Sequence, residues 1–323
     1  MTKNKTICDV HTHGWNDPNV GKGLLGLLSE LPLRLYEYPH TGRALLEMCE
    51  KKFPNTDTLI ALANQPLPRD NANYLFYEPV VNSILRNQAY KGRIDDNHIN
   101  TYIVVEGEKA DRVIARANEP VTPEGHCLLL FLSKNVIPGP IIDVLKWARD
   151  EEDAVIGADH PLMLSNYVIE KSRFPQKQIL KAKKRLGDWF SEGGRMSIGY
   201  EGLQKYRAYL EFIETINSNC PELEQLTSQV AKEFNLPGIA NSDAHRVAQV
   251  FSSYTVMHDL DCKNSNPDRL RESYRRALLS PDTKLVAGAN GIEGSAHFVI
   301  GSYNIARQAI GLLKRKPITI EKP

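Results

Sequence analysis

The chain lacks a long apolar run, a paired-cysteine motif and an excess of charge of either sign. No stretch has the length of a signal peptide or a membrane-spanning helix, since the longest apolar run, which begins near Cys127, stops at Ser133. The five cysteines include no C-x-x-C pair, and their odd number argues against a closed disulfide framework. We therefore predict a cytoplasmic protein without a membrane segment.

The charge balance excludes strong attraction to polyanions. The chain has 40 Lys and Arg against 39 Asp and Glu, a formal net charge of +1, so no global field draws it to nucleic acid or to an anionic membrane. A predicted helix over 176–190 carries five basic residues. Such a run is usually a solvated helix face, so nucleic acid is a possible partner that the net charge does not indicate. No oligomeric state is indicated.

Short apolar runs alternate with helical patterns along the chain, without internal repeats or a linker-like segment. The predicted strands cover residues 6–10, 58–63, 101–105, 127–132, 154–158, 210–216 and 238–240. The predicted helices cover residues 43–52, 140–150, 176–190, 222–234, 268–279 and 300–314. This order predicts an α/β protein with a parallel sheet or barrel in a single domain over 1–323. We expect an irregular insertion over the barrel mouth at about 15–57 and a helical closing segment at about 265–323.

Histidines and acids gather at the ends of these predicted strands. His11 and His13 follow the first strand, and residues two apart on an extended chain point to the same side. Asp243 and His245 repeat this spacing after the strand at 238–240. His160 follows the strand at 154–158, and His126 opens the strand at 127–132. A lone histidine at either of these places is more often structural, but together the four positions predict a metal site.

Imidazole and carboxylate ligands together suit zinc, manganese or iron better than calcium or magnesium, which prefer oxygen ligands alone. More than four ligands imply more than one ion, because four already complete a tetrahedral zinc site. Clustered ions make hydroxide from water near neutral pH and stabilise the oxygens of a phosphoryl group. The residues alone therefore predict a metal-dependent hydrolase.

These motifs resemble the PHP family, named from its polymerase and histidinol-phosphatase members. The family pattern begins with D-x-H-x-H, continues with a Glu after a middle strand, a His and an H-P pair, and ends with S-D-A-H. Here the corresponding residues are Asp9-Val10-His11-Thr12-His13, Glu106-Gly107-Glu108, His126, His160-Pro161 and Ser242-Asp243-Ala244-His245. In addition, Glu214-Thr215-Ile216-Asn217 looks like the E-x-x-N strand of the family.

The resemblance implies a distorted TIM-like (β/α)7 barrel with a helical C-terminal extension and two or three divalent ions, of Zn, Mn or Fe. A bridging Glu would share one ion with His11, His13 and Asp243, and a second with His126 and His160. His245 would belong to a third ion. Asp243 and His245 would also act in catalysis. The expected substrate is a small phosphorylated compound or a nucleotide.

The chain departs from the family pattern at two places. The family usually shows T-D-H after the second strand, where this chain has Ala63-Asn64-Gln65, and the loop after His13 lacks its usual histidine. We therefore expect two well-occupied ions, with the third absent, weak or rebuilt from His40 or Asp17.

The bridging glutamate is also displaced by one residue relative to the family spacing. A gap-free alignment places Lys109 there, and an ammonium group cannot bind a cation unless the lysine is carbamylated. We expect Glu108 to serve, with Glu106 as the alternative. Each could instead belong to a solvated acidic turn.

Two arginines are candidate anchors for a substrate anion. Arg246 directly follows His245, and its guanidinium could bind a phosphate in bidentate fashion, although a surface arginine explains it equally well. Arg69 lies where the missing T-D-H loop would be.

The leading hypothesis is a metal-dependent phosphoesterase that uses a metal-activated hydroxide. One alternative keeps the metal barrel but assigns it amidohydrolase-like cleavage of C–N or C–O bonds. The other is a non-catalytic ligand-binding protein of PHP type.

Overall fold

The structure is a computed structural model, and it describes nine stretches of the chain. These are residues 5–13, 41–64, 77–120, 122–137, 139–162, 197–218, 223–244, 249–261 and 266–288. The helices predicted over 176–190 and 300–314 therefore lie outside the described residues. Of the predicted insertion at 15–57, only residues 41–57 are described.

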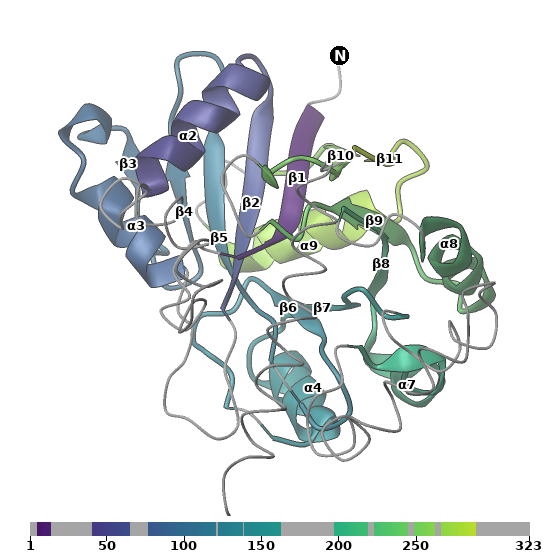
Figure 1. Cartoon of the computed structure of the whole chain (residues 1–323). Helices are drawn as coiled ribbons and strands as arrows, with labels where there is room; N and C mark the ends of the chain where they lie inside the picture. Colours follow the sequence, from purple (N-terminus) through teal and green to yellow (C-terminus); the bar gives the residue numbers. More distant parts are fainter. Residues whose placement is uncertain are drawn as a thin grey trace, which may run out of the picture.

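Seven strands form a nearly closed barrel (Figure 1). In spatial order they are β1 (Lys5–Thr12), β2 (Asp57–Asn64), β5 (Arg112–Asn118), β6 (Leu128–Leu130), β7 (Val155–Ala158), β8 (Phe212–Asn217) and β9 (Gly238–Asn241). A parallel bridge between Thr12 and Ala244 brings the ends of β1 and β9 together, and the His13 amide donates to the Ala244 carbonyl at 2.8 Å. The expected distorted TIM-like barrel is confirmed.

One strand of this ring runs against the others, which corrects the expectation of a parallel barrel. β6 pairs antiparallel with both β5 and β7, while β1, β2 and β5 are parallel, as are β7, β8 and β9. A reversed strand begins where its neighbours end. The first residues of β6 therefore lie at the same edge as the carboxyl ends of the six other strands.

Four further strands extend the sheet. They are β3 (Ile94–Asp95), β4 (Tyr102–Val105), β10 (Tyr254–His258) and β11 (Lys284–Val286). β10 pairs antiparallel with β1 and with β11, and β4 pairs antiparallel with β5 and with β3. The strand predicted over 101–105 is thus β4, outside the ring, whereas β5 was not predicted.

Helices cover the barrel. They are α2 (Thr41–Lys52), α3 (Tyr77–Leu85), α4 (Ile141–Asp150), α7 (Gly199–Tyr206), α8 (Glu224–Glu233) and α9 (Pro267–Leu278), with short 3-10 turns η2 (Gln88–Tyr90) and η3 (Arg207–Tyr209). The helices predicted over 43–52, 140–150, 222–234 and 268–279 are confirmed as α2, α4, α8 and α9. Figure 1 shows α2 and α3 beside β2 and β5, with α4, α7 and α8 around the other half.

Strand residues are buried on both faces, as expected when helices cover a sheet. Along β5, Val113 and Ala115 face the barrel interior, whereas Ile114 packs among residues of α2 and α3. The interior cluster also contains Leu270 and Tyr274 of α9. The helix α9 therefore closes the barrel at the end where the parallel strands begin.

The start of α9 follows from its sequence. The Asn266 side chain accepts a hydrogen bond from the Asp268 amide at 2.9 Å, and Pro267 occupies the first helical turn. Further along this helix, Arg271 donates to the Phe131 carbonyl at 2.7 Å. Phe131 follows β6, so the reversed strand ends at the closed side of the barrel.

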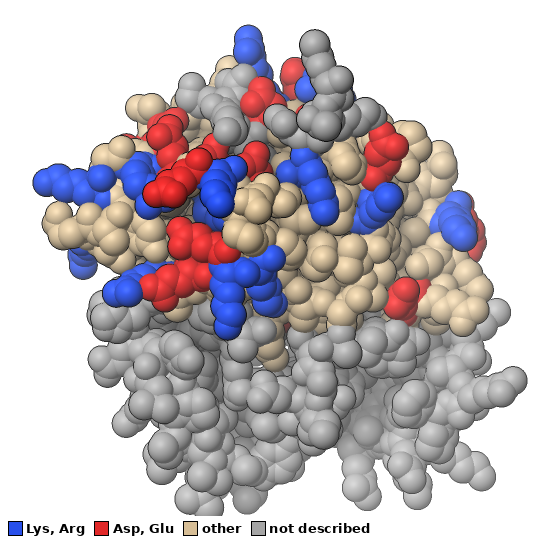
Figure 2. All heavy atoms as spheres, turned by 90° about the horizontal axis from the view of Figure 1, so that it is seen from above, with Lys and Arg blue, Asp and Glu red and all other residues tan. Residues whose placement is uncertain are grey.

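The surface shows no segregation of charge on the face drawn in Figure 2. Described Lys and Arg side chains lie there among Asp and Glu, in keeping with the net charge of +1. Among the described helices, none has both the length and the apolar character needed to cross a bilayer.

Candidate metal centre

His11 and His13 leave the end of β1 with their ring nitrogens in defined orientations. His11 Nδ1 lies 3.1 Å from Glu214 Oε1, and His13 Nδ1 lies 3.2 Å from the Ala63 carbonyl oxygen. Both outer partners are acceptors, so each imidazole donates through Nδ1 and directs Nε2 toward the acidic groups of the site. The two Nε2 atoms point toward the same acidic groups, which is the arrangement that metal-binding histidines require.

Glu119, at the end of β5, divides its two carboxylate oxygens between two sets of histidines. Its Oε1 lies 2.6 Å from His126 Nδ1 and 3.2 Å from His160 Nε2. Its Oε2 lies 3.2 Å from His13 Nε2 and 3.8 Å from His11 Nε2. The side chain is buried. A carboxylate in this position can bridge two cations, one on each side.

Asp243 completes the set around Oε2 of Glu119. Its Oδ1 lies 3.6 Å from His11 Nε2 and 3.3 Å from His13 Nε2. Its other oxygen accepts a hydrogen bond from Asn217 Nδ2 at 3.1 Å. The backbone of Asp243 has φ 47°, a left-handed conformation that residues other than glycine adopt at some cost.

The spacing of these atoms matches a tetrahedral ion site. Four distances join His11 Nε2 and His13 Nε2 to Glu119 Oε2 and Asp243 Oδ1, and they run from 3.2 to 3.8 Å. Zinc bonds of about 2.0–2.1 Å in a tetrahedral site place neighbouring ligand atoms about 3.4 Å apart. These four distances therefore suit a divalent cation, and His11, His13 and Asp243 form a group whose donor atoms all lie within 4.8 Å of one another.

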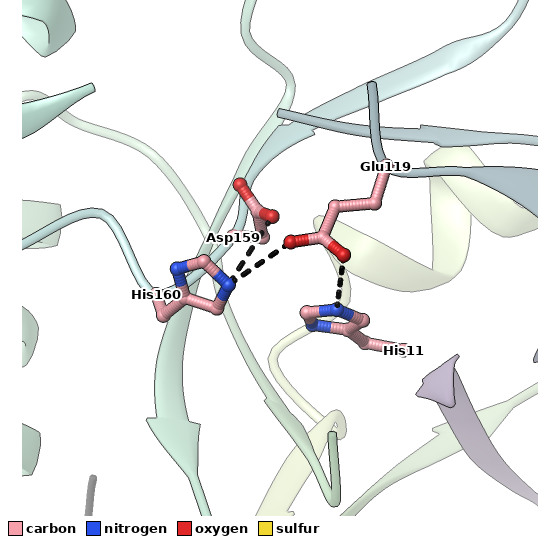
Figure 3. A group of neighbouring side chains, drawn as sticks. All are labelled: His11, Glu119, Asp159 and His160. Atoms are coloured by element: carbon pink, nitrogen blue, oxygen red, sulfur yellow. Dashed lines mark hydrogen bonds and ion pairs between the residues drawn. The ribbon is translucent and has the colours of Figure 1, made fainter. Parts of the chain in front are cut away.

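A second set lies around Oε1 of Glu119 and contains His126 and His160. Asp159 lies beside His160, with Oδ2 3.5 Å from His160 Nε2. Figure 3 shows Glu119, Asp159 and His160 together with His11. His160 has φ 23°, so a second residue of the group has a left-handed backbone. His126 lies just before β6, and His160 lies just after β7. The reversed direction of β6 thus brings His126 to the rim.

An outer layer of hydrogen bonds holds both sets. Glu214 of β8 contacts His11 through Oε1, and its Oε2 accepts from the His160 amide at 2.7 Å and from Asn217 Nδ2 at 3.0 Å. Asn217 also reaches Asp243, as described above. Glu214 and Asn217 are three residues apart and would point to opposite sides of a regular strand, but the pairing of β8 with β9 shifts register between Glu214 and Ile216. Both side chains therefore reach the site, where they orient groups of the two sets.

Asp9 fixes the strand exits and belongs to neither of the two sets. Its oxygens accept hydrogen bonds from the Ser242 amide at 2.9 Å, the Ser242 hydroxyl at 2.5 Å and the Phe251 amide at 2.8 Å. Burial raises the pKa of Asp9 to about 7, although these hydrogen bonds oppose the shift. Asp9 therefore ties the end of β1 to the loop that carries Asp243.

Burial and opposite charges shift the pKa values in this group strongly. For His11, burial lowers the pKa, but the carboxylates of Asp243 and Glu214 outweigh it and leave the pKa well above its usual value. The pKa of His160 rises to about 10, because Asp159 and Glu119 outweigh burial. For Glu119, burial raises the pKa, but His126 and the hydrogen-bonding histidines bring it well below its usual value. Protonated imidazoles thus compensate the negative charge of the buried carboxylates. A divalent cation bound at the same place would compensate it as well.

Buried polar atoms that lack a hydrogen-bond partner also fit a cation site. Among the described residues, His11 Nε2 and both oxygens of Asp159 are buried without a hydrogen-bond partner. Buried polar atoms are nearly always satisfied, so such atoms facing one another point to a ligand between them. Two groups have donor atoms close enough to share an ion: His11, Glu119, Asp159 and His160, and His11, His13 and Asp243.

The structure brings together five of the ligands expected from the sequence: His11, His13, His126, His160 and Asp243. It does not bring Glu108 or Glu106 to them. The remaining candidates lie outside the described residues: Asp17, His40, Arg69, His245 and Arg246. Their proposed roles stay predictions.

The placement of the bridging glutamate is corrected by the topology. Glu106 and Glu108 are exposed in the loop that follows β4. Because β4 is antiparallel to β5, this loop lies at the edge where the parallel strands begin, away from the site. Glu119 follows β5 and occupies the position expected for Glu108.

Sequence reasoning missed Glu119 because it missed β5. Arg112 and Arg116 interrupt an otherwise apolar run, and both are buried with their guanidinium groups bonded to backbone carbonyls. The apolar residues Val113, Ile114 and Ala115, followed by Asn118-Glu119-Pro120, were the available signal. Asp159 was also missed as a member of the group, although it directly precedes His160.

Comparison with known proteins gives one family match. The model described as PHP-associated matches residues 224–277, which include α8, β9, Asp243, β10 and most of α9. This match supports a PHP-family protein. It covers a later part of the described barrel and includes one residue, Asp243, of the two sets described above.

Curated proteins and solved structures add little to this assignment. No curated protein matches the chain. Among solved structures, PsfC from Pseudomonas syringae PB-5123 matches with a TM-score of 0.49 and 13% sequence identity, over 95% of this chain and 99% of that chain.

Proposed function

We propose that the chain is a metal-dependent phosphoesterase of PHP type that hydrolyses a small phosphorylated compound with two divalent ions. The observation that carries the proposal is the position of Glu119, whose two oxygens face two separate sets of donors. Support also comes from the PHP-associated match, since the family is generally one of hydrolases and phosphoesterases.

The proposed ligand sets follow from the distances. His11, His13, Asp243 and Oε2 of Glu119 would hold one ion. His126, His160 and Oε1 of Glu119 would hold the other. Nitrogen donors mixed with carboxylates favour zinc, manganese or iron over calcium and magnesium.

Two such ions would lower the pKa of a water and stabilise the charge that develops on phosphoryl oxygens. The residues of the chain orient the ligands and exclude water. Glu214 and the Ala63 carbonyl hold His11 and His13 in one tautomer, so that both Nε2 atoms remain available. Burial of the ligands excludes competing water and strengthens their interaction with charge.

The direction of approach follows from exposure. The side chains of His126 and Asp243 retain 11% and 7% exposure, whereas His11 and Glu214 have none. We infer that a substrate reaches the site from the side of His126 and Asp243, at the carboxyl ends of the parallel strands. In α/β barrels this is the end where catalytic sites lie.

The test combines metal analysis with a substrate panel. Protein purified without chelator is analysed for bound metals, then assayed with phosphomonoesters, phosphodiesters and N-acyl compounds. The variant His11→Ala/His13→Ala should lose bound metal and at least 100-fold in turnover of an aryl phosphate. His258→Gln is the matched control, because this imidazole lies at the end of β10, beside the start of β1, and should leave both unchanged.

The outcomes separate the candidate functions. Full activity of the double variant would contradict the proposal. Turnover of N-acyl compounds alone would favour amidohydrolase-like chemistry on the same barrel. Fewer than one ion per chain in the unaltered protein would favour a non-catalytic ligand-binding protein.

A further inference from the structure

Asp159 is a buried carboxylate that differs from the other buried acids of the barrel. It follows β7, is fully buried, and neither of its oxygens has a hydrogen-bond partner among the described residues. Asp9 accepts three hydrogen bonds, and Glu152 accepts from the amide and hydroxyl of Ser133. Burying a carboxylate without such partners is costly unless a charge faces it.

The Asp159 side chain faces the group around Glu119 (Figure 3). Its Oδ2 lies 3.5 Å from His160 Nε2, and one donor atom from each of His11, Glu119, Asp159 and His160 lies within 4.8 Å of the others. Consecutive residues of a regular strand point to opposite sides. The left-handed backbone of His160, with φ 23°, departs from that pattern at the point where both side chains meet the group.

We propose that Asp159 is a ligand of the second ion, alongside Glu119, His126 and His160. The inference rests on the two-ion site of the proposed function, and it adds a residue that the family motifs do not assign. Asp159 would give the second ion two carboxylates and two imidazoles, the same donor set as the first.

Charge balance supports this role. Four buried carboxylates belong to the group: Glu119, Asp159, Glu214 and Asp243. Two divalent cations carry the charge that neutralises four ionised carboxylates. In the metal-free chain Asp159 faces the His160 imidazole at 3.5 Å, yet burial, with Glu119 beside it, still raises the pKa of Asp159 well above its usual value. A cation in the group would compensate the charge of this carboxylate.

The experiment measures Zn²⁺ binding to the metal-free full chain by competition with a chelating indicator. Asp159→Asn should keep the first ion and weaken the second at least tenfold, because the amide has nearly the same shape without the charge. Glu152→Gln is the matched control: it also removes a buried negative charge after α4, but this acid contacts Ser133 and Lys134 rather than the site. It should bind two ions as the unaltered protein does.

Thermal unfolding of the metal-free protein gives a second readout. A protein loses stability when a carboxylate with a structural role is replaced. Asp159→Asn should instead leave the melting temperature unchanged or raise it, because it removes a buried acid that accepts no hydrogen bond from the described residues. If Asp159→Asn does not fold, Asp159→Ala is measured in the same way.

Each outcome has a distinct meaning. Unchanged affinity for two Zn²⁺ ions in Asp159→Asn overturns the inference and leaves the proposed function intact. Fewer than two ions in the unaltered chain overturns both. Two ions with a specific loss in Asp159→Asn, but no turnover of any phosphoester, supports the role of Asp159 and overturns the phosphoesterase.

Discussion

Glu119 and Glu108 lie at opposite ends of β5. Glu119 follows the last residue of this strand, Asn118, whereas Glu108 precedes its first residue, Arg112. A strand of seven residues spans about 23 Å, so the two carboxylates belong to opposite edges of the barrel. The edge of Glu119 is the one that carries His11, His13, His126 and His160.

This separation gives the first prediction. Glu119→Gln should remove the bridging charge and reduce occupancy of both ions, with a loss of at least 100-fold in any hydrolytic turnover. Glu108→Gln, an exposed position, should change neither. Metal content after gel filtration and the rate of aryl phosphate hydrolysis measure both effects. Loss of metal in Glu108→Gln alone would mean that the strand order around β5 is different.

The second prediction concerns Glu214, which holds His11 through Nδ1. Glu214→Gln should lower metal affinity roughly 10- to 100-fold, because the outer acceptor orients the imidazole and raises its basicity. Competition with a chelating indicator measures the change, and Glu233→Gln at the end of α8 is a control outside the site. Equal affinity in both variants would show that the contact with His11 is dispensable.

The third prediction is that metal affinity rises with pH. In the metal-free protein the pKa of His160 is about 10 and that of His11 is raised well above its usual value. Near neutral pH both rings are therefore protonated, and a cation must displace their protons. Affinity should increase from pH 6 to pH 9, with protons released on binding. Calorimetry in buffers of different ionisation enthalpy measures this release, and an affinity independent of pH would contradict it.

The fourth prediction concerns Asp9, which accepts three hydrogen bonds at the exits of β1 and β9. Asp9→Asn turns an N–H group toward donors of Ser242 and Phe251. The variant should lose about 1–3 kcal/mol in the free energy of unfolding. Urea unfolding measures the loss, and Asp96→Asn, an exposed position, should stay within error of the parent. Equal stability of the two variants would argue against the tether.

The fifth prediction concerns Gly125, which precedes His126. Its φ is +129°, and a Cβ there would lie 2.4 Å from the Ser197 backbone. Gly125→Ala should therefore cost about 1–3 kcal/mol in stability and weaken the ion near His126. Gly139→Ala, where a Cβ would meet nothing within 4 Å, is the control. A Gly125→Ala protein with normal stability and metal content would be inconsistent with this turn.

The sequence predicted those ligands that follow strands with a largely apolar pattern. His11, His13, His160 and Asp243 follow such strands, and the structure brings them together. The spacing of these residues along the sequence is enough to predict that they meet, because residues two apart on a strand share a face.

The bridging residue was not predictable in the same way. Arg112 and Arg116 disguise β5 as a polar segment, because the sequence does not show that their guanidinium groups are satisfied by backbone carbonyls. The direction of β6 was equally hidden, since an apolar run does not indicate whether a strand runs parallel or antiparallel to its neighbours. These two facts decide which glutamate meets the histidines.

The reversed strand also joins parts of the two ion sets on one hairpin. Glu119 ends one arm, β5, and His126 begins the other, β6, so a single loop fixes their separation. A residue added to or removed from that loop would alter the distance between a shared ligand and a partner of one ion only. The length of this loop would therefore change the affinity for one ion without changing the affinity for the other. One ion could then stay bound while the other is lost.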